Sequence, residues 1–407
     1  RKRRDLNNID HVDQIWEYLK LKCGETIAIN DLRGKNNEKY SYSELANLIT
    51  KVSISFKKYG LIKGDVVTLI SENSPRWLIA DQGLMRLGAI NAVRGVNSPS
   101  LELEYIIEHS NSVGLIVQSK EVWLKLNKKD ELKKRLKFII NLSDEQCEDL
   151  INWSEFIKEG DKDYLKNNNF EKDNHQINDI ASILYTSGTT GKPKGVPLTH
   201  ANFLHQIINL ACIADPEPGT SVLSVLPIWH SYERSAEYFF FSCGCTQFYT
   251  NPKFLKDDIK QVKPVVMATV PRLWEAIHDG FFLALKKMPP KKQKLIKFLI
   301  KNSSIFKRNL RKIRNIEINQ VSFFLRISLT ISVVGRFLVH KLSSAFLWPS
   351  ILKQLCGEKL KFPINGGGAL PEHVDLFFES LGIDVLVGYG LTETSPVLTC
   401  RSRELNV

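Results

Sequence analysis

The sequence lacks cysteines at metal-binding spacing. Among its seven cysteines, Cys243 and Cys245 lie close together, but no second pair accompanies them. This excludes the usual four-ligand zinc modules. No apolar segment follows the basic residues Arg1 to Arg4, so no secretory signal peptide is visible. We therefore expect reduced thiols in a cytosol-like compartment.

Internal repeats and low-complexity tracts are also absent, which excludes solenoids and disordered polar chains. Hydrophobic residues make up 43% of the chain and aromatic residues 10%, which is enough for sizeable cores. A chain of 407 residues is too long for one core. We expect two or more α/β-sized units.

Acidic residues are missing from one long stretch. The formal net charge is +12, and residues 280–316 contain twelve Lys or Arg and no Asp or Glu. Apolar residues recur there at helical spacing, with basic residues such as Lys297 and Lys301 on the other side. Two interpretations stay open. The stretch is either a peripheral surface for anionic lipid headgroups or a solvated face on helices that cover a sheet.

The sequence also predicts no membrane-spanning segment. Residues 321–348 are mostly apolar. Arg326, Arg336 and Lys341 divide them into apolar runs that are too short to span a membrane. We expect residues 280–357 to form a basic helical insertion. Aromatic residues are not interleaved with basic ones as in nucleic-acid-binding modules, so we expect no nucleic-acid partner.

Helical and strand patterns alternate through the rest of the chain. Ser41 and Glu44 form a capping box before one helix, and Ser74 and Pro75 open another that stops at Gly88. Short apolar runs predict strands near residues 66–70, 89–93, 113–117, 138–141, 180–185, 221–226, 245–249, 265–269, 360–364 and 384–388. This alternation predicts the α/β class, with two doubly wound, mostly parallel sheets packed through helices.

The domain organisation follows from this alternation. We expect a first α/β subdomain at residues 1–178, ending in a polar surface connection at 142–178. We expect a second α/β subdomain at residues 179–407, interrupted by the insertion at 280–357.

The stretch "ILYTSGTTGKPKG", residues 183–195, lacks the hydroxyl that a P-loop requires. Pro193 follows Lys192, where a P-loop has Ser or Thr. Small residues, several hydroxyls and two lysines still suit an anion, since they let backbone N–H groups approach it and neutralise its charge. The alternative is a flexible turn.

Three further segments follow predicted strands: "LPIWHSYER" (226–234), "NGGGALP" (365–371) and "GYGLTETSP" (388–396). The first places Trp229, His230 and Arg234 near a carboxyl strand end, where open α/β sheets bind ligands, although a lone histidine is often structural. The glycines of the second leave room for a planar group. The third supplies an aromatic ring, a hydroxyl and a carboxylate.

In this order, the four segments resemble the adenylate-forming superfamily of acyl-CoA synthetases, luciferases and nonribosomal-peptide adenylation domains. The resemblance covers the chain from about residue 20 onward. "NSPRWLIADQG" (73–83), "VPRLWE" (270–275) and the basic insertion are similar, more narrowly, to long-chain fatty acid ligases. The most similar branch, from photosynthetic bacteria and plastids, loads acyl carrier protein.

The resemblance implies an ATP site with Mg²⁺. Tyr389 would stack on adenine, Thr392 would touch the α-phosphate, and Thr189 and Glu393 would lie near the metal. The residues implied to bind the nucleotide are Thr186, Ser187, Gly188, Thr189, Thr190, Gly191, Lys194, Gly366, Gly367, Gly368, Tyr389, Gly390 and Thr392. Those implied in catalysis are His230, Thr392, Glu393 and Lys192.

The resemblance also implies a carboxylic acid substrate. His230 occupies the place where amino-acid-activating relatives carry an Asp, which favours a simple carboxylate. A carboxylate is already ionised at neutral pH, so its attack on phosphorus needs charge neutralisation and positioning rather than a general base. Residues 236–250 either wall an apolar tunnel or form an ordinary buried helix and strand.

The thiol acceptor and the exact acid stay open. CoA and acyl carrier protein both suit a basic surface. The family continues past "YGLTETSP" with a mobile carboxyl-terminal domain, so we expect this chain to bind nucleotide weakly and to be poor in overall ligation. The alternatives are a ligase for an aryl or short-chain acid and a noncatalytic, basic, membrane-associated protein. We expect a cytoplasmic or plastid-stromal protein, with peripheral membrane contact through residues 280–357.

Overall fold

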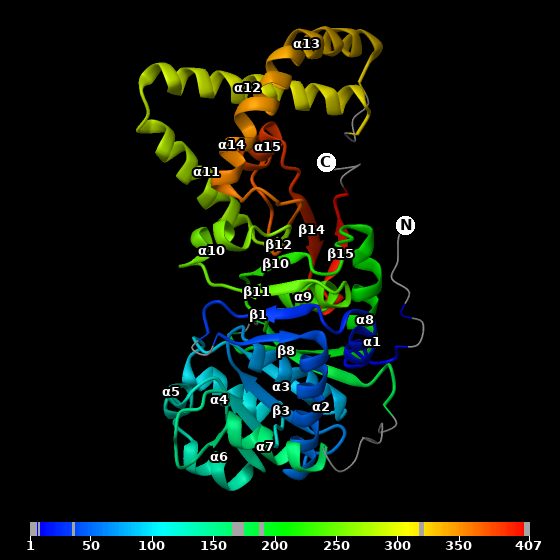
Figure 1. Ribbon diagram of the computed structural model, residues 1–407, viewed down its shortest axis with the longest axis vertical. Helices are drawn as coiled ribbons and strands as arrows, with labels where there is room; N and C mark the ends of the chain where they lie inside the picture. The colour runs from blue at the N-terminus through cyan, green and yellow to red at the C-terminus, as the bar shows by residue number, and fades with distance from the viewer. Residues whose placement is uncertain are drawn as a thin grey trace.

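The molecule consists of two helix-covered sheets and a helical projection (Figure 1). The expected α/β class with two mostly parallel sheets is confirmed. The computed structural model describes residues 6, 9–34, 37–164, 175–186, 191–316 and 321–402.

The first sheet has seven strands in the order β7-β6-β5-β3-β4-β8-β9. Neighbouring strands are parallel except in the β8–β9 hairpin, which is antiparallel. Its strands are β3 (Val66–Ile70), β4 (Ile90–Arg94), β5 (Gly114–Val117), β6 (Phe138–Asn141), β7 (Ile151–Asn152), β8 (Ile180–Thr186) and β9 (Lys194–Thr199).

The second sheet has eight strands in the order β15-β14-β13-β12-β10-β11-β1-β2. The outermost pair at each edge is antiparallel, and the strands between are parallel. Its strands are β1 (Ile27–Asn30), β2 (Lys39–Ser41), β10 (Ser221–Ser224), β11 (Thr246–Tyr249), β12 (Val266–Thr269), β13 (Phe362–Asn365), β14 (Leu386–Gly390) and β15 (Val397–Cys400).

Helices connect these strands and cover the sheets (Figure 1). The first half of the chain contains α1 (Gln14–Cys23), α2 (Tyr42–Lys58), α3 (Pro75–Arg86), α4 (Ser100–His109), α5 (Lys120–Leu124), α6 (Lys129–Arg135) and α7 (Trp153–Tyr164). The second half contains α8 (His200–Asn209), α9 (Ser231–Ser242), α10 (Leu255–Val262), α11 (Pro271–Lys286), α12 (Pro290–Ile313), α13 (Phe323–Leu342), α14 (Trp348–Leu355) and α15 (Glu372–Leu381).

Two helices begin at the caps that the sequence predicted. At α2 the Ser41 hydroxyl accepts from the Glu44 backbone N–H at 3.2 Å, and the Glu44 carboxylate accepts from the Ser41 N–H at 2.8 Å. At α3 the Ser74 hydroxyl accepts from the Trp77 N–H at 3.1 Å, with Pro75 in the first turn. Both caps satisfy backbone donors that have no partner within the helix.

A buried ion pair joins the helices that the two sheets contribute to the centre of the molecule. Arg234 on α9 pairs with Asp81 on α3, and both side chains are fully buried. The guanidinium also donates to the Ser182 hydroxyl at 2.6 Å, the Asn91 amide oxygen at 2.9 Å and the Tyr238 hydroxyl at 2.8 Å. Arg234, expected near the ligand-binding strand ends, therefore lies in the core instead.

Two organisational predictions differ from the structure. The polar connection predicted at 142–178 contains α7, whose Trp153 and Phe156 are buried against α2. The strand predicted at 180–185, placed with the second series, belongs to the first sheet, where β8 pairs with β4. Conversely, β1 and β2 belong to the second sheet. Periodicity reports local structure, whereas these pairings depend on contacts distant in sequence.

The basic insertion forms a projection made of α11 to α14, at the end of the molecule farthest from the first sheet (Figure 1). Trp274 on α11 and Trp348 on α14 are buried in a cluster with Phe378 of α15, which fixes the base of the projection. The segment Phe323–Leu355 contains a helix long and apolar enough to cross a membrane, and its most apolar window is not buried. The expectation that charged residues reduce it below spanning length is therefore wrong.

Candidate active site

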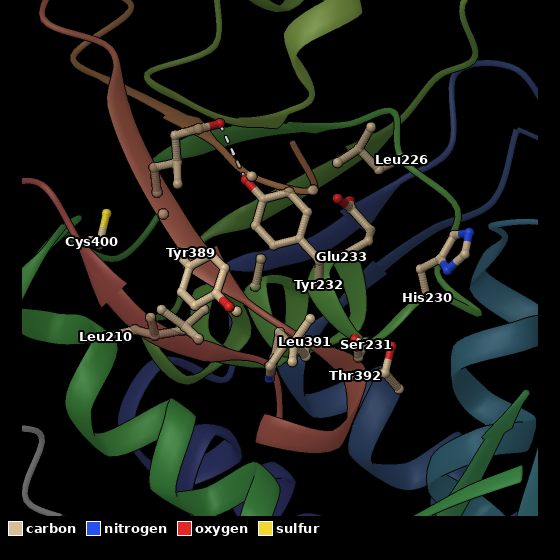
Figure 2. Close-up of a pocket in the computed structure, with 18 of the residues that line it drawn as sticks. Leu210, Leu226, His230, Ser231, Tyr232, Glu233, Tyr389, Leu391, Thr392 and Cys400 are labelled. Atoms are coloured by element: carbon tan, nitrogen blue, oxygen red, sulfur yellow. Dashed lines mark hydrogen bonds between the residues drawn. The ribbon is translucent and has the colours of Figure 1, made fainter. Parts of the chain in front are cut away.

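A cavity of about 550 Å³ opens at the carboxyl ends of the neighbouring strands β14, β13, β12 and β10. This is the edge of an open parallel sheet where ligands bind. Eight of the residues singled out from the sequence line it: Thr186, His230, Gly366, Gly367, Tyr389, Gly390, Thr392 and Glu393. Figure 2 shows Tyr232 in the middle of the cavity, between Tyr389 and His230.

The remaining candidates lie elsewhere or are not described. Ser187, Gly188, Thr189 and Thr190 lie outside the described residues. Gly191, Lys194 and Gly368 are not in the cavity lining. The Lys192 ammonium lies 5.8 Å from the centre of the Tyr105 ring, over α4, and Lys192 does not line the cavity either. The structure thus brings Thr186, at the start of the threonine-rich loop, to the cavity.

Glycines are required where two strand tips meet their neighbours. A Cβ added at Gly366 would lie 2.9 Å from Cζ of the Tyr232 ring, which covers the glycine backbone. The Tyr232 hydroxyl donates to the Ile364 carbonyl at 3.3 Å, a bond drawn in Figure 2. A Cβ at Gly390 would lie 1.9 Å from the Pro396 carbonyl oxygen. Both glycines therefore permit close packing along one side of the cavity.

Hydroxyl groups and one carboxylate gather where β14 ends. Thr392 and Glu393 lie in a short 3₁₀ turn, Thr392–Thr394, and the Ser231 hydroxyl donates to the Thr392 hydroxyl at 3.3 Å. Figure 2 shows these two hydroxyls side by side. Among the described residues there is no group of three or more His, Cys, Asp or Glu that could hold a metal ion. One carboxylate with hydroxyls fits Mg²⁺, which keeps most of its ligands from water and phosphates.

His230 stands at one side of the cavity as the residue preceding α9. Its ring lies 4.1 Å from the Trp229 ring, and the Arg94 guanidinium lies 5.0 Å from that indole. Burial, followed by the positive charge of Arg94, lowers the pKa of His230 below its ordinary value. His230 is therefore neutral at neutral pH, and can donate one hydrogen bond without adding a charge.

Two residues that the sequence interpretation missed hold the 226–230 segment in place. The Asn73 amide donates to the Leu226 carbonyl at 2.7 Å and accepts from the Ile228 N–H at 2.8 Å. The Glu72 carboxylate accepts from the Trp229 indole N–H at 3.3 Å. Both follow β3, so their position after a buried strand was the available signal.

Arg94 was missed as well, and it ties the threonine-rich loop to the first sheet. Its guanidinium donates to the Tyr185 carbonyl at 2.9 Å, one residue before Thr186, and pairs with Glu102 at 2.6 Å. Arg94 ends β4, and β4 pairs with β8. This contact fixes the strand end from which the loop departs.

The cavity also has apolar walls. They come from residues after α8, from α9 and from the strand ends: Leu210, Ile213, Ala214, Leu226, Ala236, Phe239, Phe240, Val270 and Ile364. Within "AEYFFFSCGCTQFYT", Ala236, Phe239 and Phe240 thus face the cavity, whereas Tyr238 and Phe241 pack in the core between the sheets. Part of this segment therefore lines the cavity, and the rest forms an ordinary buried helix and strand.

A buried carboxyl group also lines this cavity. Burial raises the pKa of Glu233 to about 8, and the Ser224 hydroxyl, which donates to one carboxyl oxygen, opposes the shift. Burial likewise raises the pKa of the neighbouring Glu237, whose carboxylate accepts from the Tyr249 hydroxyl at 2.7 Å. Glu233 is therefore protonated at neutral pH, and it adds no negative charge to the cavity.

We expect stability to fall as pH rises through the pKa of Glu233. A carboxyl group whose folded pKa is about 8, above its unfolded value, stabilises the fold fully below about pH 4.5 and loses this contribution between there and pH 8. In the Glu233→Gln variant the free energy of unfolding should fall less over this pH range, by on the order of 3 kcal/mol, because the amide does not titrate. Urea unfolding across this pH range measures it. Parallel curves for the two proteins would contradict the assignment.

Comparison with known proteins agrees with this geometry. A family model described as "AMP-binding enzyme" matches residues 18–406. The chain is similar to the N-terminal domain of FACL13 from Mycobacterium tuberculosis, with a TM-score of 0.64 and 16% identity over 97% of this chain and 80% of that one. It is also similar to a long-chain-fatty-acid-CoA ligase from Archaeoglobus fulgidus, with a TM-score of 0.68 and 17% identity over 97% of this chain and 66% of that one. At these identities the structures show a shared fold.

Two relatives from Arabidopsis thaliana are more similar in sequence. A probable acyl-activating enzyme 16, named as chloroplastic, is 36% identical over 98% of this chain. A long-chain-fatty-acid–[acyl-carrier-protein] ligase, also named as chloroplastic, is 34% identical over 97% of this chain. The chain spans 58% and 57% of the length of these two relatives.

Proposed function

The chain belongs to the family of AMP-binding enzymes, and we propose that its cavity activates a long-chain fatty acid with ATP. A carboxylate oxygen attacks the α-phosphorus, the bond to pyrophosphate breaks, and an acyl-adenylate forms. A thiol sulfur of CoA or acyl carrier protein then attacks the acyl carbon and releases AMP. The supporting observation is that one cavity is lined both by Gly366, Gly367, Tyr389 and Thr392 and by apolar side chains such as Phe239 and Phe240.

The polar end provides the contacts that a nucleotide needs. We assign the exposed Tyr389 ring to stacking on adenine, and the backbone at Gly366 and Gly367, which line the same cavity, to the adenine edge. Thr392 is assigned to the α-phosphate. The loop after Thr186, with Lys192 and Lys194, is assigned to the β- and γ-phosphates.

Glu393 is the group that would hold Mg²⁺, together with Thr189 and the phosphates. Bound there, the metal supplies neutralisation of phosphate charge. The protein's own contribution is positioning: Thr392 is held by Ser231, and the 226–230 segment is held by Asn73. Since a carboxylate is ionised at neutral pH, no residue has to remove a proton from it.

The acyl end favours a hydrocarbon chain. Phe239, Phe240 and Val270 offer apolar surface, and the neighbouring Glu233 is neutral at neutral pH because burial raises its pKa to about 8. His230, which is neutral, closes the side of the cavity next to the substrate carboxylate. It offers no negative charge that could pair with the ammonium group of an amino acid. One relative's name includes an acyl carrier protein and another's CoA, so either thiol is a candidate acceptor. Both Arabidopsis relatives are named as chloroplastic, which supports a location of this protein in the plastid stroma or in the cytoplasm.

The test uses non-hydrolysable acyl-sulfamoyl adenosines of increasing chain length. Each buried methylene contributes about 0.8 kcal/mol, so affinity should rise about fourfold per methylene until the cavity is filled. Calorimetry on the purified chain measures this. The benzoyl analogue is the control for an aryl acid. Tighter binding of that analogue would exclude the long-chain assignment, and no binding of any analogue would exclude the nucleotide site.

A further inference from the structure

The helix α13 presents its apolar side to solvent. Large apolar residues recur along it at intervals of three or four residues, which places them on one helical face. We call this face the outer stripe of α13: Phe324, Ile327, Ile331, Val334, Leu338 and Leu342. Ile331 is 68% exposed and Leu338 is 65% exposed, and no residue of α13 is buried. A helix that covers a soluble core has the opposite orientation.

The other side of α13 is polar and faces α12. The Asn309 amide donates to the Ser332 hydroxyl at 3.0 Å, and the Asn302 amide donates to the Arg336 carbonyl at 3.3 Å. His340 is hydrogen-bonded to Ser303 at 2.9 Å. These contacts fix the rotation of α13 on α12, so turning the outer stripe inward would break them. Its exposure is therefore built into the packing of the projection.

The segments that form the projection are strongly basic. Residues 280–316 contain twelve Lys or Arg and no Asp or Glu, and residues 321–357 also contain no acidic residue. Within the described part of the chain, Arg311 is the one cation among those twelve that forms a salt bridge, with Glu379 at 2.9 Å. On α12 the side chains of Lys291, Lys294 and Lys297 are exposed.

We propose that the projection docks on an anionic lipid bilayer, with α13 lying in the plane of the interface. The outer stripe enters the boundary between headgroups and acyl chains, while the lysines of α12 meet lipid phosphates. A second copy of this chain fits the surface less well, because the pairing would bring two strongly positive segments together. A spanning orientation would strip Ser332, Arg336 and His340 from their partners on α12.

Vesicle flotation of the purified chain tests this. The chain should float with vesicles of phosphatidylcholine mixed with phosphatidylglycerol, and less with phosphatidylcholine alone or at high salt, which screens the charges. Two variants test the apolar and the electrostatic contributions to membrane binding separately. Ile331→Glu with Leu338→Glu, and separately Lys291→Gln with Lys294→Gln and Lys297→Gln, should each weaken binding to the anionic vesicles about tenfold or more.

A matched control uses exposed leucines outside the projection. Leu21 is 90% exposed and Leu101 is 74% exposed, so Leu21→Glu with Leu101→Glu makes the same chemical change away from the surface. This variant should float like the unchanged chain. The proposal is overturned if the unchanged chain does not float, or if both projection variants float unchanged. It is also overturned if the outer-stripe variant abolishes self-association instead, or if the chain resists extraction by carbonate at high pH, as a spanning helix does.

Discussion

Replacing Asp81 by alanine is expected to lower the free energy of unfolding by about 3–5 kcal/mol, because it leaves the Arg234 guanidinium buried without its counter-charge. Neither side chain is accessible to solvent, so water cannot replace the carboxylate. Asn91 and Tyr238 also lose a partner, since both donate to Asp81. Chemical denaturation at neutral pH measures the change.

Two comparisons separate this effect from a general loss of charge. Glu159→Ala removes a carboxylate from the exposed pair with Lys162, 2.7 Å away, and should leave the free energy of unfolding nearly unchanged, because solvent screens this pair. Asp81→Leu combined with Arg234→Met removes both buried charges, and should recover part of the stability lost in Asp81→Ala. If the single substitution costs no more than Glu159→Ala, the ion pair does not have the role described.

The second large effect is expected at Gly390, where alanine should weaken AMP binding roughly 100-fold, because the strand tip that carries Tyr389 and Thr392 has to move. The added Cβ would lie 1.9 Å from the carbonyl oxygen of Pro396, which is a backbone atom and cannot rotate away. Overpacking of this kind also costs about 1–3 kcal/mol of stability. Calorimetric titration with AMP and thermal unfolding measure the two effects.

Gly280→Ala is the matched control. A Cβ at this helical glycine meets nothing within 4 Å, so alanine should leave AMP binding unchanged. It should stabilise the chain by about 0.5–1 kcal/mol, since alanine favours the helix. Unchanged AMP affinity in Gly390→Ala would show that this strand tip does not contact the nucleotide.

Local rules predicted much of the fold. The caps at Ser41 and Ser74 were visible because the cap, its partner and the helix start lie within four residues. Runs such as Val66–Ile70 and Phe138–Asn141 were visible because strands buried on both faces are continuously apolar. The convergence of the tips of β10, β13 and β14 followed from the rule that parallel strands end at the same edge. The rule does not cover Thr186, which reaches the cavity from β8 of the first sheet.

Long-range partners could not be predicted in this way. Arg234 looked like a site residue because it follows a strand, yet its partner Asp81 lies on α3, far away in sequence. Glu72, Asn73 and Arg94 have no local motif that announces their contacts with Trp229, Leu226 and Tyr185. Similarly, the helix α7 was not predicted because most of its residues are polar. Only a few apolar side chains, including Trp153 and Phe156, pack on α2.

The position of the β1–β2 hairpin in the second sheet constrains how this protein folds. The β1–β2 hairpin, made early during synthesis, completes a sheet whose neighbouring strand β11 begins at Thr246. The β8–β9 hairpin, encoded after α7, closes the sheet built by the amino-terminal strands. Contacts of such high sequence separation are slow to form. Folding during translation can therefore complete the first sheet, whose strands run from Val66 to Thr199, whereas the β1–β2 hairpin stays unpaired until more than two hundred residues have followed it.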